Sequence, residues 1–173
     1  MAMRERYPRL SVLYLDAHGD LRDQYMGTHW GHASVARRVS ELASLVQIGV
    51  RSVSAEEMAF IKSEGINTFF LNPNFSPLEF LSQVLPLLNE HVYLSVDLDV
   101  LDPSIMAAVG TPEPGGMTWG QVSSVVETLS KNRTVVGFDL TELSPRLGPE
   151  ACAVTAAKLV HKIIACVTHN KTG

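Results

Sequence analysis

The sequence predicts one α/β domain over residues 1–173, built as a three-layer α/β/α arrangement around a mainly parallel sheet of about five strands. Two observations predict this fold class. Apolar runs rich in β-branched and aromatic residues alternate with helix-like segments, which is the order of a parallel sheet covered by helices on both faces. The runs are also nearly continuous rather than alternating, as expected of strands that are buried on both sides.

The predicted strands are short apolar runs with room for a helix between them. They are residues 10–15, 45–50, 68–71, 92–98 and 134–140. In a parallel sheet the carboxyl ends of all these strands lie at the same edge, where ligand sites of open α/β folds form. The residues that follow each strand are therefore the first place to look for a functional site.

The predicted helices begin at capping boxes, in which a Ser or Thr is followed three residues later by a Glu or Gln. Apolar residues at helical spacing continue from these starts and predict packing faces rather than functional ones. The capping pairs are Ser54 with Glu57, Ser76 with Glu79, and Thr118 with Gln121, and Pro77 strengthens the second. The apolar faces are Val35, Val39 and Leu42, then Val122, Val125, Val126 and Leu129, then Leu159, Ile163 and Val167.

The composition narrows the classes of function. A net charge of -4, with 14 Lys and Arg against 18 Asp and Glu, offers no basic stripe for a phosphate backbone, so we expect no nucleic-acid partner. Apolar runs such as residues 159–164 are shorter than the roughly 20 residues of a bilayer span, so we expect no membrane segment. The N-terminus does not resemble a secretory signal, and Cys152 and Cys166 are too far apart on one predicted helix to pair. We therefore expect a cytoplasmic protein.

Acidic residues follow two of the predicted strands. Residues 16–20 read Asp-Ala-His-Gly-Asp directly after the first strand, and Asp97 and Asp99 end the fourth. If the first strand persists, Asp16, His18 and Asp20 share one face. Four carboxylates held close together repel one another unless a positive charge compensates them. Two divalent cations would do so, and an oxygen-rich set with one imidazole favours manganese over zinc or magnesium.

A single acidic pair at a strand end is more often a helix cap or a solvated turn than a metal ligand. The combination favours a metal site, because each cluster ends a buried strand and one contains a histidine at a suitable spacing. A two-metal phosphoesterase also uses clustered carboxylates but needs cations for the phosphate, and Arg22 is the only one near either cluster.

Four segments resemble, in order, the signature segments of the ureohydrolase family, which includes arginases and agmatinases. They are DAHGD at 16–20, SVDLDVLDP at 95–103, GTPEPGG at 110–116 and DLTELSP at 139–145. The form of the third, together with HAS at 32–34 and VQIGVRS at 46–52, is more similar to agmatinases than to arginases. The resemblance implies an arginase-like fold and manganese-dependent release of urea from a guanidino compound, most simply agmatine, with putrescine as the other product.

The resemblance also implies roles for individual residues. Asp16 and Asp97 would bridge two manganese ions, Asp20 would complete one ion, and His18 and Asp99 would complete the other. Asp99 is also counted among the catalytic residues, and Asp102 would lie outside the ligand set. Catalysis would further use His32 as the proton donor and Glu142 as the partner of the guanidinium, with Thr111 contacting the substrate.

Alternatives stay open for several of these residues. His32 could instead cap the helix that follows it, His29 could compete for its role, and Glu142 could be a turn carboxylate. Candidates for the lining of the far end of the substrate pocket are Asp23, Gln24 and Trp30.

The resemblance covers essentially the whole chain but not the whole family domain. The chain begins where the fourth strand of the family would be, so the first three strands and the Gly-Gly-Asp-His segment that supplies one manganese ligand are missing. A truncated or incomplete chain, or a short protein completed by another subunit, would explain this. We expect a homo-oligomer. The competing hypothesis is a catalytically silent domain that serves binding or oligomerisation.

Overall fold

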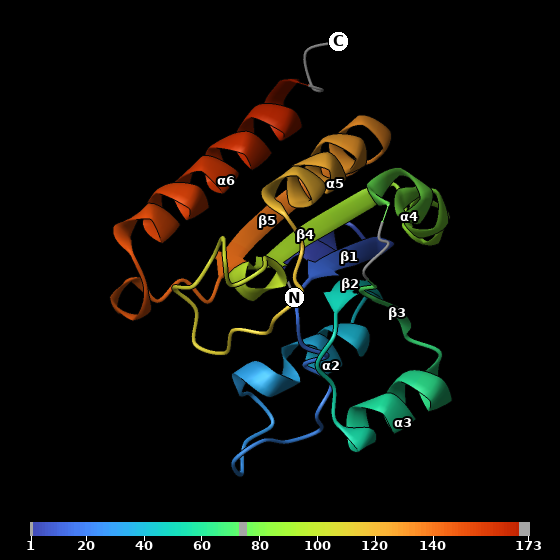
Figure 1. Cartoon of the computed structure of the whole chain (residues 1–173). Coiled ribbons are helices and arrows are strands. Elements are labelled where there is room, and N and C mark those ends of the chain that lie inside the picture. Colours follow the sequence, from blue (N-terminus) through green and yellow to red (C-terminus); the bar gives the residue numbers. More distant parts are fainter. Residues whose placement is uncertain (1, 73–75, 170–173) are drawn as a thin grey trace.

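The computed structural model describes residues 2–72 and 76–169 and contains a five-stranded, entirely parallel sheet with the strand order β3-β2-β1-β4-β5 (Figure 1). The predicted strands are confirmed, with ends that differ by no more than one residue. The strands are β1 (Leu10–Leu15), β2 (Ser44–Val50), β3 (Asn67–Phe70), β4 (His91–Asp97) and β5 (Thr134–Thr141). The two strands that precede the acidic clusters, β1 and β4, are neighbours near the middle of the sheet.

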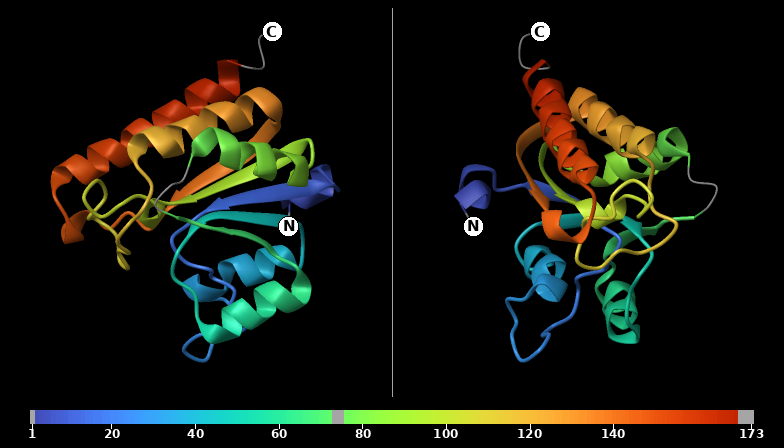
Figure 2. Two further views of the ribbon diagram at one scale, coloured as in Figure 1. Left: turned by 45° about the vertical axis from the view of Figure 1, so that its right-hand side comes forward. Right: turned by 60° about the vertical axis from the view of Figure 1, so that its left-hand side comes forward.

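Helices cover both faces of the sheet, as the sequence predicts (Figures 1 and 2). Helices α4, α5 and α6 lie on one face, and α2 and α3 lie on the other. The helices are α1 (Ala2–Arg6), α2 (Val35–Ser40), α3 (Ala55–Glu64), α4 (Pro77–Val84), α5 (Trp119–Asn132) and α6 (Glu150–His169).

Two of the three predicted capping boxes are present. The Ser54 hydroxyl accepts from the Glu57 amide while the Glu57 carboxylate accepts from the Ser54 amide, and Thr118 and Gln121 repeat the arrangement at the start of α5. Helix α4 begins at Pro77 as predicted, but Ser76 makes no side-chain capping bond. The Glu79 side chain lies outside the described part of the structure.

The larger core lies between the sheet and α4–α6. The predicted apolar faces of α5 and α6 are buried there, with Val167 partly buried. A smaller core lies between the sheet and α2 and α3. The prediction for α2 is partly wrong: α2 ends at Ser40, before Leu42, and Val35 is 43% exposed while Ala36 is buried.

Helix α6 is long and apolar enough to span a membrane by length and composition alone, with a mean hydropathy of 1.5 over its most apolar window. Only 22% of that window is buried, although four of its side chains, from Cys152 to Ile163, belong to the core. A core helix of a soluble protein meets the same criteria. The expectation that no segment spans a membrane therefore stays a prediction.

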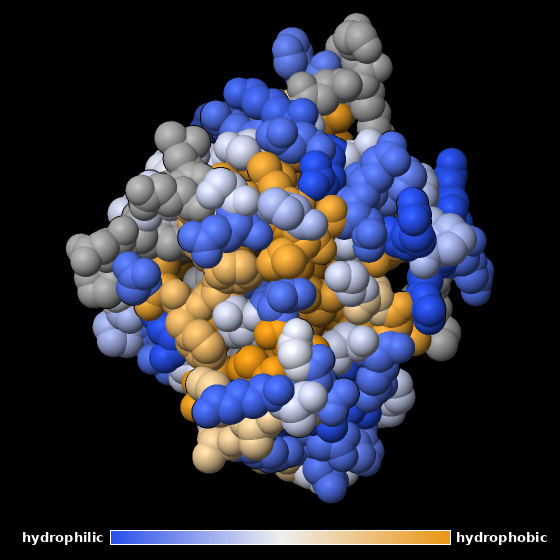
Figure 3. All heavy atoms as spheres, turned by 90° about the vertical axis from the view of Figure 1, so that its right-hand side faces the viewer, coloured by the Kyte–Doolittle hydropathy of each residue, from blue (hydrophilic) through white to orange (hydrophobic). Residues whose placement is uncertain are grey.

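The two edges of the sheet differ. At the β3 edge, Figure 3 shows apolar side chains in the middle of the face on the α4 and β3 side, bordered by hydrophilic ones, and Phe70 at the end of β3 is 42% exposed. At the other edge, β5 pairs only with β4 among the described residues. Helix α1 lies near the start of these strands, where Tyr7 stacks on His91 with ring centroids 4.7 Å apart.

Candidate active site and metal centre

A pocket of about 490 Å³ lies at the carboxyl ends of the strands and brings together all the residues that the sequence singles out as metal ligands or catalytic groups. Its charged lining is dominated by six carboxylates, with Arg22 as the only Arg or Lys side chain among the lining residues. The predicted residues in the lining are Asp16, His18, Asp20, His32, Asp97, Asp99, Thr111 and Glu142, and they are joined by Glu57, Tyr25 and Ser54.

The segment after β1 does not continue as a strand, so the condition under which Asp16, His18 and Asp20 would share a strand face is not met. Strand β1 ends at Leu15, His18 makes an isolated bridge with Ser52, and Asp20 adopts a left-handed backbone with φ 51°. The Ala17 carbonyl accepts from the amides of Arg51 and Ser52, which ties this segment to the end of β2. The three side chains still enter one pocket because the segment turns rather than extends.

A short helical turn presents the second acidic cluster. Strand β4 ends at Asp97, and Asp99 lies in a 3-10 turn, Leu98–Val100. One Asp97 oxygen accepts from the Asp99 amide at 3.1 Å and caps this turn. The Ala17 amide donates to Asp99 Oδ1 at 3.1 Å, so the turn after β4 is fixed to the segment after β1.

Asp16, His18 and Asp99 offer one donor atom each within 4.8 Å of one another. His18 Nδ1 lies 3.0 Å from Asp99 Oδ2 and 3.4 Å from Asp16 Oδ1. Asp16 and Asp99 are almost completely buried, whereas His18 is partly exposed to the pocket. These three groups form a compact candidate metal site.

Asp97 and Asp20 stand beside this site and are held by hydroxyl groups. Thr141 donates to Asp97 Oδ2 at 3.1 Å, and the buried Tyr14 donates to Asp20 Oδ2 at 2.9 Å. The sequence interpretation missed both donors, although Tyr14 comes two residues before Asp16 and Thr141 directly precedes Glu142. The sequence signal for both donors was a hydroxyl-bearing side chain in a largely apolar strand, β1 for Tyr14 and β5 for Thr141.

The surroundings of Asp16, Asp20 and Asp97 disfavour the ionised forms of these carboxyl groups. Burial, followed by the charges of Asp16 and Asp99, raises the pKa of Asp97 to about 9. Burial and the charge of Asp16 raise the pKa of Asp20 to about 8, and burial raises that of Asp16 to about 6. For Asp99, burial raises the pKa, but the hydrogen bond from His18, the charge of His18 and the Ala17 amide together hold it below its usual value.

His18 compensates part of this negative charge. Its hydrogen bonds to Asp16 and Asp99 raise its pKa to about 11, so the ring is a cation in the metal-free protein. One imidazolium cannot balance four carboxylates, and Asp20 and Asp97, with pKa values of about 8 and 9, hold protons near neutral pH. A divalent cation on this oxygen-rich set would remove that need, so the residues present fit a hard divalent metal ion.

The structure separates the two competing histidines. His32 begins a short 3-10 helix, lines the pocket and packs edge-on against Tyr25, with ring centroids 5.4 Å apart. His29 bonds to the Asp23 carbonyl at 2.8 Å and lies outside the pocket. No side chain of this short helix caps it, so the capping interpretation of His32 is wrong.

Thr111 and Glu142 reach the same pocket from two different loops. Thr111 Oγ1 lies 3.4 Å from Asp99 Oδ2. Glu142 is exposed at the pocket, has a left-handed backbone with φ 64°, and places a carboxylate oxygen against Gly110, where an added Cβ would lie only 3.4 Å away. Non-glycine residues rarely adopt this conformation, which costs on the order of 1 kcal/mol and often marks a functional site.

The three candidates for the far end of the pocket are wrong. Asp23 pairs with Arg38 at 2.9 Å, Trp30 is 82% exposed beside a different and smaller groove, and Gln24 does not line the pocket. Arg22 and Tyr25 from the same loop do line the pocket.

Comparison with known proteins identifies the family of this chain. A profile of the arginase family matches residues 1–166, nearly the whole chain. The chain belongs to the arginase family. Among curated relatives, it is 42% identical over 167 residues to an agmatinase of Pyrococcus horikoshii, covering 91% of this chain and 58% of that protein. It is 37% identical over 164 residues to an N(1)-aminopropylagmatine ureohydrolase of Thermus thermophilus, covering 94% of this chain and 56% of that protein.

Solved structures of the arginase family share this fold. The agmatine ureohydrolase of Thermoplasma volcanium superposes with a TM-score of 0.81 at 34% identity, covering 92% of this chain and 55% of that one. The arginase of Bacillus subtilis gives 0.83 at 25% identity, covering 94% of this chain and 65% of that one. The chain thus has the arginase-like fold and spans little more than half the length of its curated relatives.

Proposed function

We propose that this chain carries the catalytic centre of a manganese-dependent ureohydrolase that cleaves a guanidinium C–N bond and releases urea and an amine. The observation that carries the proposal is the convergence of Asp16, His18 and Asp99 in one pocket with Asp20, Asp97, His32 and Glu142. Membership of the arginase family supports it. Agmatine is the proposed substrate, with putrescine as the amine.

The proposed metal ligands are the four aspartates and His18. His18 and Asp99 would complete one manganese site and Asp20 the other, with Asp16 and Asp97 shared between them. Manganese, when bound here, would supply the positive charge that activates a water molecule as the nucleophile. His18 would then act as a neutral ligand, because a metal ion replaces its proton.

The remaining residues act on the substrate. The Glu142 carboxylate would pair with the planar guanidinium and hold its carbon toward the metal site, which keeps the cation charged and oriented. His32 would donate a proton to the leaving amine, and the Thr111 hydroxyl would contact the substrate. The acidic lining of the pocket favours a cationic substrate over an anionic one, which argues against a phosphoesterase.

The names of the two relatives point to two closely related substrates, agmatine and N(1)-aminopropylagmatine. N(1)-aminopropylagmatine carries the same guanidinium on a longer polyamine, and the Thermus relative is named for it. Arginine and guanidinobutyrate are further guanidino compounds: arginine has an added carboxylate, and guanidinobutyrate has a carboxylate instead of the amine of agmatine. Initial rates of urea release from the four compounds rank these alternatives directly.

The central test is manganese-dependent urea release. The wild-type chain is assayed with and without manganese beside Asp97→Asn, and Asp23→Asn serves as a matched control because Asp23 lies outside the pocket. We expect activity that requires manganese, survives Asp23→Asn and is lost in Asp97→Asn. Tight manganese binding with no urea from any of the four compounds would instead support the catalytically silent domain.

A further inference from the structure

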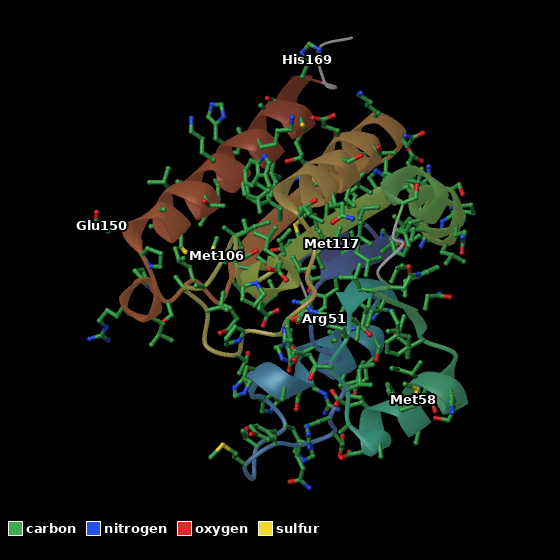
Figure 4. The ribbon with its side chains drawn as sticks, in the orientation of Figure 1. Arg51, Met58, Met106, Met117, Glu150 and His169 are labelled. Atoms are coloured by element: carbon green, nitrogen blue, oxygen red, sulfur yellow. The ribbon has the colours of Figure 1, made fainter. Side chains whose placement is uncertain are left out.

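Arg51 lies directly after β2 beside the pocket, but it is not one of the side chains that line it. Figure 4 shows it near the centre of the molecule. Its guanidinium makes no ion pair within the described residues and donates instead to backbone carbonyls of three separate segments. The acceptors are Asp99 at 2.7 Å, Glu113 at 2.8 Å, Gly49 and Pro114 at 3.1 Å, and Val100 at 3.4 Å.

These acceptors join the parts of the site. Gly49 belongs to β2, Asp99 and Val100 form the turn after β4, and the other two lie in the loop of residues 110–116. One planar guanidinium with five donors can bridge three backbone segments at fixed angles, which a single ammonium group cannot do. Burial lowers the pKa of Arg51, but a guanidinium stays charged in proteins.

A second contact fixes the other end of the same loop. Asp102 Oδ2 accepts from the amides of Gly115 and Gly116 at 2.9 and 3.1 Å. The backbone of Gly116 passes so close that an added Cβ would lie 2.5 Å from the Asp102 amide nitrogen and 2.7 Å from Arg51 Nη2. The loop is therefore packed onto the turn after β4 with no space for a side chain at this point.

The clamped loop faces the metal site. Thr111, at its start, contacts Asp99, and Glu113 Oε1 lies 3.7 Å from His18 Nε2. A displacement of the loop would therefore move groups that touch both His18 and Asp99, although Arg51 itself touches neither side chain.

We propose that Arg51 is a positioning residue that clamps the 110–116 loop to the turn carrying Asp99 and thereby fixes the geometry of the His18 and Asp99 metal site. The proposal rests on the metal site of the proposed function. It assigns Arg51 no contact with substrate or metal.

The test compares Arg51→Met with Arg133→Met. Arg133 is a matched control because it also donates to backbone carbonyls, those of Leu85, Leu88 and Asn132, but directly before β5 at the opposite end of the sheet. Manganese affinity is measured by calorimetry, amide hydrogen exchange is followed across residues 110–117 in the metal-free protein, and thermal melting records the loss of stability common to both variants.

We expect Arg51→Met to weaken manganese binding roughly tenfold, the lower end of the effect of losing a partner that supports a metal ligand, and to accelerate exchange across residues 110–117. Arg133→Met should lower the melting temperature without either effect. Arg51→Lys should fall between wild type and Arg51→Met, and it provides both readouts if Arg51→Met does not fold.

Equal effects of the Arg51 and Arg133 variants on manganese affinity and loop exchange would overturn the proposal. If the wild-type chain binds no manganese, the exchange measurement decides alone, and unchanged exchange in the Arg51 variants rejects the clamp. If the Arg51 variants behave as expected but wild type releases no urea, the proposed reaction fails while the clamp stands.

Discussion

At the scale of single residues, neighbours in the sequence differ in whether their side chains line the pocket. His29 and His32 are three residues apart in one loop, yet only His32 lines the pocket. Asp20 and Glu142, two of the three non-glycine residues with positive φ in residues 2–72 and 76–169, also line it. Backbone strain of this kind is held by the surrounding structure and cannot be read from residue type alone.

The histidine pair gives a direct prediction. His32→Asn should lower the rate of urea release about 10²- to 10⁴-fold, the usual contribution of a general acid, with little change in manganese affinity. His29→Asn removes an imidazole from the same loop and should leave the rate unchanged. Steady-state kinetics and calorimetry on both variants check this, and equal losses in the two would exclude His32 as the proton donor.

The raised pKa values predict how stability depends on pH without metal. The folded-state pKa values of Asp20, Asp97 and His18 are about 8, 9 and 11, above the ordinary values of 3.8 for Asp and 6.5 for His. Each group binds more proton in the folded state, so its contribution is complete below its ordinary pKa and is lost as pH rises through the raised value. Between pH 6 and 9 the contributions of all three groups to the free energy of unfolding therefore decrease as the pH rises.

We therefore expect the melting temperature of the metal-free protein to fall as pH rises from about 6 to 9. Manganese should reverse this trend, because binding needs deprotonated ligands and strengthens as pH rises. Thermal melts in chelator and in excess manganese check both statements. A metal-free melting temperature that rises over this interval would contradict the raised pKa values of Asp20, Asp97 and His18.

At the scale of elements, the two capping boxes have the same pattern but different neighbours. Glu57 and Gln121 each close the box at the third helical position. Glu57 is also buried, and its Oε1 accepts from the Leu21 amide at 3.0 Å, next to Asp20. The capping carboxylate of α3 thus also holds the loop of the metal site.

This difference is measurable as stability. Glu57→Ala should lower the free energy of unfolding by about 2–3 kcal/mol, because a charged acceptor serving two amides is lost in a buried position. Gln121→Ala removes an exposed cap and should cost about 1 kcal/mol. Denaturant titrations of both variants give the comparison, and equal costs would show that the Leu21 contact contributes nothing.

The sequence predicts the elements that depend on local patterns, but not the turns that depend on contacts between residues far apart in the chain. The strands followed from apolar runs, and two helix starts followed from local capping chemistry at Ser54 and Thr118. Whether the first strand continues through residues 16–20 stayed open in the sequence, and it does not continue, because the Ala17 carbonyl accepts from the amides of Arg51 and Ser52. Such a turn depends on residues far along the chain, as do the Arg51 contacts, so local patterns cannot predict it.

At the scale of the whole molecule, the five strands leave one side of β5 without a partner among the described residues. A strand edge of this length is a template for pairing with another chain. Val136 is half-buried in this strand and is not part of the main core. A charge at this position would oppose edge-to-edge pairing while leaving the α4–α6 core intact.

We expect the chain to associate reversibly with rising concentration and Val136→Lys to weaken that association. Sedimentation velocity over a concentration series measures it, and Ala157→Lys on the exposed face of α6 is the control for added charge. Association that is the same in both variants would place the contact elsewhere.

The adjacency of β1 and β4 has a consequence for cooperativity. A bond such as that from the Ala17 amide to Asp99 spans 82 residues of chain, so the ligand set exists only while the two central strands remain paired. A partly opened form in which β1 and β4 separate therefore cannot bind the ion. Manganese should therefore suppress opening of the middle of the sheet by its full binding energy, while fraying of β3 at the outer edge continues unchanged.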